Sequence, residues 1–98
     1  MDPVVSIVMS VYNGEDMLRN TIESILKQTV QNFEFIIIND GSTDRSKEII
    51  LSYADKRICI YNQENKGLAC ALNLGIVNSS GKYIARMDAD DIARKNRI

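Results

Sequence analysis

Histidine and tryptophan are absent from this sequence of 98 residues, which also contains only 1 proline and 2 cysteines. Without histidine, the chain cannot supply a Ser-His or Cys-His nucleophile pair, a histidine-rich zinc site or a histidine general base. Any metal bound here would be held mainly by oxygen, which favours Mg²⁺ or Mn²⁺. Cys59 and Cys70 lie in apolar segments and form no CxxC pair, so we expect buried, reduced thiols.

Neither sign of charge dominates the sequence. There are 12 basic and 13 acidic residues, a net charge of -1, so no nucleic-acid partner is expected. Apolar runs such as residues 35–38 are far too short to cross a membrane, and the N-terminus lacks the basic start of a signal peptide. We expect a cytoplasmic protein with no membrane segment within residues 1–98. If the full-length protein has a membrane segment downstream, we expect it to be located at the inner face of that membrane.

Apolar segments alternate with segments of helical periodicity along the whole chain. Short runs of the strand type occupy residues 4–11, 33–38, 58–61 and 82–87, and helical spacing occupies about 15–28, 46–53 and 68–76. This β-α-β-α-β-α-β order predicts an α/β, Rossmann-like unit with a parallel sheet and helices on both faces. Ligands of such sheets bind beyond the carboxyl ends of the strands, so the loops after the strands are the expected site.

The loops after the first two strands carry polar residues suited to a nucleotide. Residues 10–15 contain only Gly14, whereas a dinucleotide-binding loop has three glycines, so a nicotinamide or flavin cofactor is disfavoured. Tyr12 either offers a flat ring on which a base could stack or packs against the following helix. Asp40 either accepts an N–H from a base, such as N3 of uracil or the edge of guanine, or caps its turn while Asp44 caps the next helix.

An acidic cluster follows the fourth strand. Asp88, Asp90 and Asp91 repel one another, so their proximity favours a compensating cation. An Asp-x-Asp spacing puts the first two carboxylates on the same side of an extended chain, where a divalent metal could bridge them to the phosphates of a nucleoside diphosphate. The alternative is an acidic N-terminus for a helix that begins near Ile92.

Taken together, these motifs resemble the N-terminal half of the family 2 glycosyltransferases. The resemblance covers nearly all of residues 4–98 and is specific because its motifs occur in the family's order and spacing. They occupy residues 6–14, 21–29, 33–44, 65–67 and 81–91. The resemblance implies a GT-A fold and inverting, metal-assisted transfer of a sugar, of the hexosyltransferase type, from a UDP- or GDP-sugar to an unknown acceptor. Residues 1–98 would then be a truncated N-terminal part of a GT-A domain, inactive alone and prone to self-association through uncovered strand edges.

The resemblance also implies roles for individual residues. Nucleotide-sugar binding is expected for Ser10, Tyr12, Asp40 and Asp88, metal binding for Asp90, and a supporting role for Asp91. The general base is expected beyond Ile98. The segment Ala71-Leu72-Asn73 departs from the family's Ala-Arg-Asn, which removes a basic contact to the donor.

Two other classes are alternatives: a non-catalytic Rossmann-like nucleotide-binding module, and a receiver-type module that binds Mg²⁺. A receiver domain has its acceptor aspartate after the third strand. Residues 61–64 of this chain read Tyr-Asn-Gln-Glu, which disfavours the receiver.

Overall fold

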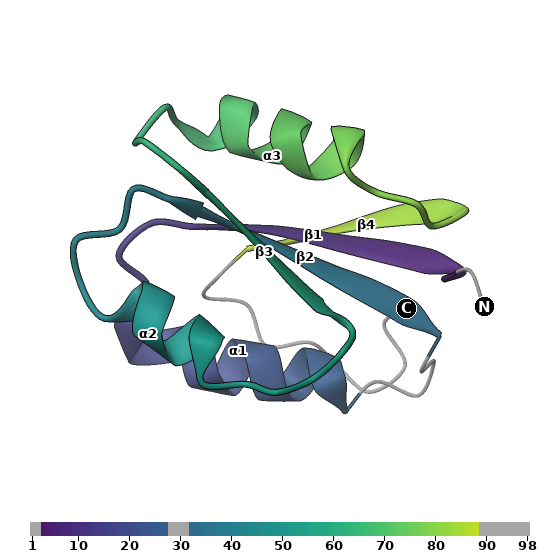
Figure 1. Cartoon of the computed structure of the whole chain (residues 1–98), viewed down its shortest axis with the longest axis horizontal. Helices are drawn as coiled ribbons and strands as arrows, with labels where there is room; N and C mark the ends of the chain where they lie inside the picture. Colours follow the sequence, from purple (N-terminus) through teal and green to yellow (C-terminus); the bar gives the residue numbers. More distant parts are fainter. Residues whose placement is uncertain (1–2, 28–31, 89–98) are drawn as a thin grey trace.

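The computed structural model describes residues 3–27 and 32–88. Four parallel strands form one sheet in the order β3-β2-β1-β4, with helices on both faces (Figure 1). This architecture confirms the predicted α/β, Rossmann-like unit. The elements are β1 (Val5–Val11), α1 (Glu15–Leu26), β2 (Phe33–Asp40), α2 (Ser46–Leu51), β3 (Ile58–Gln63), α3 (Leu68–Val77) and β4 (Tyr83–Asp88).

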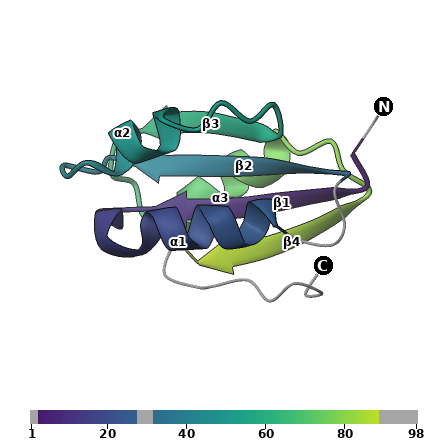
Figure 2. The same cartoon turned by 90° about the horizontal axis from the view of Figure 1, so that it is seen from below.

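The order of the strands places a switch point beside β1. The chain runs outward from β1 to β2 and β3, and α3 then returns it to β4 on the other side of β1. Helices α1 and α2 cover one face of the sheet and α3 covers the opposite face (Figures 1 and 2). Open α/β sheets bind their ligands outside the carboxyl ends of the strands at such a point.

Alternation along β1 supplies both layers of the core. Ile7, Met9 and Val11 belong to the larger cluster with α1 and α2, whereas Val8 belongs to the smaller cluster under α3. In α1, where helical spacing was predicted over about residues 15–28, one apolar stripe is buried, with Leu18, Ile22 and Ile25 at 0% exposure. The core therefore extends on both sides of the sheet, which holds the ends of β1 and β2 rigidly.

Strand β2 is longer than the apolar pattern predicted, because two polar residues continue it. Asn39 and Asp40 pair in register with Asn62 and Gln63 of β3. The side chains pair as well: Asn39 Nδ2 donates to Asn62 Oδ1 at 3.1 Å, and Gln63 Nε2 donates to Asp40 Oδ1 at 2.7 Å. Cross-strand hydrogen bonds thus satisfy polar groups at a buried strand end, where apolar periodicity gives no signal.

Strand β4 is an edge strand and is partly exposed. Tyr83 and Ile84 are 60% and 49% exposed. The expectation that both cysteines are buried was wrong for Cys70, which is exposed on α3, while Cys59 is half-buried. Helix α3 is apolar on all sides, so its sequence did not reveal which face packs on the sheet. Within the described residues, no helix has the length and apolar character that a membrane crossing requires.

Candidate functional site

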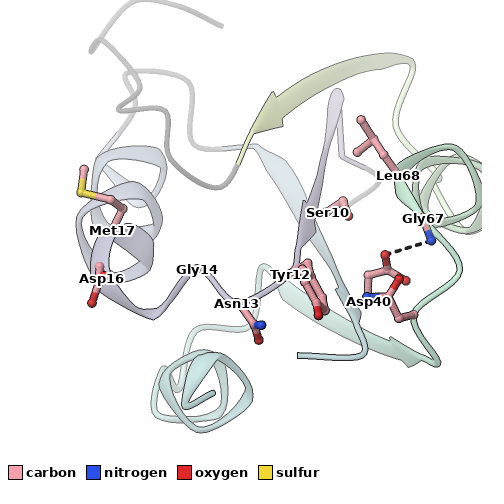
Figure 3. Close-up of a pocket in the computed structure, with 10 residues that line it drawn as sticks. Ser10, Tyr12, Asn13, Gly14, Asp16, Met17, Asp40, Gly67 and Leu68 are labelled. Atoms are coloured by element: carbon pink, nitrogen blue, oxygen red, sulfur yellow. Dashed lines mark hydrogen bonds between the residues drawn. The ribbon is translucent and has the colours of Figure 1, made fainter. Parts of the chain in front are cut away.

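A cavity of about 710 Å³ opens at the carboxyl ends of β1 and β2 (Figure 3). Its walls come from the β1–α1 loop, the first turn of α1, the end of β2, the β3–α3 loop and the start of α3. This volume is in the range of sites for small molecules and cofactors. The lining residues are Ser10, Tyr12, Asn13, Gly14, Asp16, Met17, Asp40, Asn65, Gly67 and Leu68.

Asp40 is a nearly buried carboxylate in this cavity wall, with 4% of its surface exposed. Its Oδ1 accepts hydrogen bonds from Gln63 Nε2 at 2.7 Å and the Lys66 amide at 2.9 Å, and its Oδ2 accepts one from the Gly67 amide at 3.1 Å. Burial alone would raise the pKa of Asp40, but these hydrogen bonds hold the pKa below its ordinary value of 3.8. The group is therefore a fixed anion, and it caps the β3–α3 loop instead of its own turn.

Two glycines shape the loops on either side of Asp40. Gly67 has φ +94° and a Cβ there would meet nothing within 4 Å, so the backbone conformation and not packing requires glycine. Gly41 has φ +72°, and a Cβ there would lie 2.6 Å from the backbone nitrogen of Asn65. The β2–α2 and β3–α3 loops are therefore in close backbone contact beside the cavity.

The two site residues predicted on the first loop both reach the cavity. Ser10 is half-buried at the end of β1, and Tyr12 follows with 52% of its surface exposed. Figure 3 shows the tyrosine ring projecting from the loop between Asn13 and Asp40. An exposed ring in a cavity wall is available to stack on a planar ligand, unlike a ring buried against a helix.

Hydrogen bonds join the β1–α1 loop to the β2–α2 loop. Asn13 Oδ1 accepts from the Thr43 amide at 2.8 Å and from the Asp44 amide at 3.3 Å. Asp44 accepts from the first amides of two helices, that of Ser46 at 2.9 Å and that of Glu15 at 3.2 Å. Burial opposes ionisation of Asp44, yet these bonds keep its pKa below the ordinary value. The predicted capping of α2 by Asp44 is confirmed, and the carboxylate also caps α1.

The predicted acidic cluster lies partly within the described part of the chain. The backbone of Asp88 ends β4 and pairs in register with Ser10, so β4 ends beside the cavity wall. Asp90 and Asp91 lie outside the described residues. Within residues 3–27 and 32–88, no group of three or more histidine, cysteine, aspartate or glutamate side chains could hold a metal ion.

Seven of the ten lining residues were not among the predicted site residues: Asn13, Gly14, Asp16, Met17, Asn65, Gly67 and Leu68. Asn13 was quoted only within the motif of residues 6–14, and Gly14 was considered only as one glycine of a dinucleotide motif that is absent. Asp16, Met17 and Leu68 lie in the first turns of α1 and α3, where the sequence carries no signal, because the angle at which a helix leaves the sheet decides what its first turn faces. Residues 65–67 were quoted only as part of a motif, although a glycine before a helix is a recognisable turn signal.

Comparison with known proteins identifies the family. Residues 6–98 match the model of the family described as "Glycosyl transferase family 2". The chain belongs to this family. It is 47% identical over 96 residues to an uncharacterized glycosyltransferase of Rickettsia typhi, and the match covers 98% of this chain but 30% of that protein. The family 2 chain thus spans about a third of the length of that relative.

Solved structures support the same fold. TarS of S. aureus, residues 1–349 in complex with UDP-GlcNAc, is 25% identical with a TM-score of 0.87, covering 97% of this chain and 28% of that one. The mannosyltransferase PcManGT from Pyrobaculum calidifontis, in complex with GDP-Man and Mn²⁺, has a TM-score of 0.82 at 22% identity, covering 92% and 28%. This family 2 chain therefore has the GT-A-like arrangement that its sequence predicted.

Proposed function

We propose that this chain is the donor-binding part of a glycosyltransferase, and that the cavity binds the nucleoside diphosphate of a nucleotide sugar. The observation that carries the proposal is Asp40, an ionised, nearly buried acceptor in the wall of a cavity beside the switch point. Family membership and the UDP-GlcNAc bound by TarS support it.

The hydrogen bonds of Asp40 favour uracil over guanine as the base. A carboxylate offers about four acceptor positions, two on each oxygen. Among the residues that the structure describes, Oδ1 already accepts from Gln63 and Lys66, whereas Oδ2 accepts only from Gly67. One position remains, which matches the single N3–H of uracil. The paired N–H groups of guanine would need a free position on each oxygen, and cytosine has no N3–H to donate.

Other cavity residues take the roles that the family resemblance implies. Tyr12 stacks on the base, because its ring is exposed in the cavity wall. Ser10 would contribute a polar contact from the end of β1. Asp88, which is paired with Ser10 in register, would lie near the ribose and donor sugar, as the family resemblance implies.

A divalent cation is part of the proposal. Asp90 would hold it, with Asp91 in support, because carboxylate oxygens are the ligands that Mg²⁺ and Mn²⁺ prefer and this acidic segment follows directly on β4. The Mn²⁺ of PcManGT is consistent with this chemistry. When bound, such a cation stabilises the negative charge of the departing diphosphate.

Transfer itself is proposed to need groups outside residues 1–98. The acceptor hydroxyl must lose its proton to a general base on the face opposite the leaving group, with inversion at the sugar carbon. Because the chain spans 30% of its Rickettsia typhi relative, we place the base and the acceptor site in the remaining part of a larger GT-A domain. The chain alone should bind donor without transferring sugar to an acceptor, whether polysaccharide or other.

Titration calorimetry with UDP, GDP and CDP, each with and without Mn²⁺, tests the proposal. We expect UDP to bind more tightly than GDP or CDP, and Mn²⁺ to strengthen binding in the wild type but not in Asp90→Ala. The matched variant Asp55→Ala removes a carboxylate of the Arg57 ion pair, away from the cavity lining, and should keep the metal effect. Absence of binding by all three nucleotides would overturn the proposal.

We also propose that the chain self-associates. The support is the position of β4 at the edge of the sheet that the described residues form, where Tyr83 and Ile84 expose apolar surface.

A cytoplasmic location is proposed as well, at the inner face of a membrane if a longer form carries a membrane segment. Free Cys59 and Cys70 suit a reducing compartment. Fractionation of cells expressing the protein would test the location.

A further inference from the structure

The β1–α1 and β2–α2 loops are joined by a set of hydrogen bonds that the proposed chemistry does not use. Asn13 Oδ1 accepts from three donors: the amide and hydroxyl of Thr43 at 2.8 and 3.3 Å, and the amide of Asp44 at 3.3 Å. In the opposite direction, the Asn13 amide donates to Ser42 Oγ at 3.1 Å. One side chain thus ties together segments 30 residues apart in sequence.

The backbone at Asn13 is itself unusual. It is the one non-glycine residue with a positive φ, +52°, within the described part of the chain. This left-handed conformation is rare for non-glycine residues and is tolerated best by asparagine and aspartate. Residues held in such conformations cluster at ligand sites when the surrounding contacts fix them. Here the three donors to Oδ1 fix a turn that comes directly after Tyr12.

Asp44 completes the connection at the helix ends. Its Oδ1 accepts from the Ser46 amide at 2.9 Å and its Oδ2 from the Glu15 amide at 3.2 Å, and Ser46 Oγ accepts from the Gly14 amide at 3.0 Å. One ionised carboxylate therefore caps the positive N-terminal ends of both α1 and α2. Both helix starts are fixed relative to the loop that carries Tyr12.

We infer that Asn13 and Asp44 are positioning residues, which hold Tyr12 over the cavity before a nucleotide arrives. This inference rests on the proposed nucleotide site. An exposed ring on an unrestrained loop would lose conformational freedom on binding, and fixing it in advance lowers that cost. Neither residue needs to touch the base, because each acts through the backbone next to Tyr12 and Gly14.

Four variants separate positioning from stability. Asn13→Gly accepts the positive φ but removes the side-chain acceptor, and Asn13→Asp restores an acceptor oxygen at the same position. Ser6→Ala is the control: it removes the hydrogen bond to Glu34 and the acceptor of the Gly81 amide, among residues outside the cavity lining. Asp44→Asn serves as the second test of the same connection and replaces Asn13→Gly if that variant does not fold.

The measurement is the Kd of UDP by titration calorimetry, together with the melting temperature of each variant. We expect Asn13→Gly or Asp44→Asn to weaken UDP binding about tenfold, which is the size of one lost restraint. Asn13→Asp should bind UDP as tightly as the wild type. Ser6→Ala should lower the melting temperature and leave the Kd unchanged. If the wild type binds UDP and the folded Asn13→Gly and Asp44→Asn bind it equally well, the positioning role alone is overturned. If the wild type binds no nucleotide, the proposed function fails with it.

Discussion

Asp40 and Gly67, 27 residues apart in sequence, are joined by a hydrogen bond of 3.1 Å from the glycine amide to the carboxylate Oδ2. This contact, the dashed line in Figure 3, links the end of β2 to the residue directly before α3. With the hydrogen bonds from the Lys66 amide and the Gln63 side chain, it holds the pKa of this nearly buried carboxylate below its ordinary value and ties the loop 65–67 to the end of β2.

Substituting Asp40 should therefore affect stability as well as binding. In Asp40→Asn, one oxygen becomes an amide N–H₂ that faces a donor, so a buried hydrogen bond is lost. We expect a loss of about 1–3 kcal/mol in the free energy of unfolding, together with loss of UDP binding. Urea unfolding and titration calorimetry measure the two effects. The control Asp55→Asn weakens the ion pair with Arg57, away from the cavity lining, and should lower stability without changing UDP binding. An equal loss of UDP affinity in both variants would argue against a specific role for Asp40.

Glu34 should make stability depend on pH. Burial would raise its pKa, but hydrogen bonds from Ser6, Ser80 and Gly81 keep the pKa below the ordinary value of 4.5. The pKa of Glu34 is therefore lower in the folded chain than in the unfolded chain, so the unfolded chain binds more protons in acid. The stability that Glu34 contributes above pH 4.5 is lost as the pH falls through the folded pKa.

Urea unfolding of the wild type and Glu34→Gln over a range of pH checks this. The variant should be less stable at neutral pH and lose less stability in acid, because it keeps an acceptor oxygen without a titrating proton. Glu48→Gln, which removes an exposed carboxylate of the Arg45 pair, controls for the loss of one negative charge. Parallel pH curves for the wild type and Glu34→Gln would contradict the assignment.

The packing of α3 on the sheet depends on a glycine. A Cβ at Gly75 would lie 2.4 Å from Cγ1 of the buried Val8. Gly75→Ala should therefore cost about 1–3 kcal/mol through overpacking, despite the better helix propensity of alanine. The exposed Asn73→Ala on the same helix should be neutral or stabilising. Adding Val8→Ala to Gly75→Ala should recover part of the lost stability if the clash with Val8 is its cause. Thermal melts that show no recovery would contradict this cause.

Self-association through the β4 edge makes a prediction about charge. A lysine on an exposed edge strand opposes pairing with a second chain, so Ile84→Lys should shift the protein toward the monomer in multi-angle light scattering. Leu51→Lys places the same charge on α2, where leucine is 59% exposed, and should leave the distribution unchanged. A wild-type monomer at high concentration would refute the proposed association.

Much of the fold was predictable, because the element order follows from local periodicity. The β-branched runs gave the strands, and the stripe Leu18, Ile22 and Ile25 gave the buried face of α1. The apolar pattern could not give the last two residues of β2, because these residues are polar and pair across the strands, Asn39 donating to Asn62 and Asp40 accepting from Gln63. It could not orient α3 either, since that helix is apolar all round, which is why Cys70 was wrongly expected to be buried.

The candidate site was only partly predictable for a similar reason. Ser10, Tyr12 and Asp40 directly end or follow strands, so the rule that ligands bind at carboxyl ends of strands identifies them. The partners of Asp40 and Asn13 lie 23 to 31 residues away along the chain. No local pattern specifies such pairs, because they arise only when three loops meet at one edge of the sheet.

A titration of the ¹⁵N-labelled chain with UDP, followed by NMR, tests directly whether this cavity binds the nucleotide. We expect the largest amide shifts at Ser10, Tyr12, Asp40 and Gly67, and we expect them to disappear in Asp40→Asn while the variant remains folded. Shifts confined to other surfaces, or no shifts at saturating UDP with the diamagnetic Mg²⁺, would contradict the assignment of this cavity as the donor site.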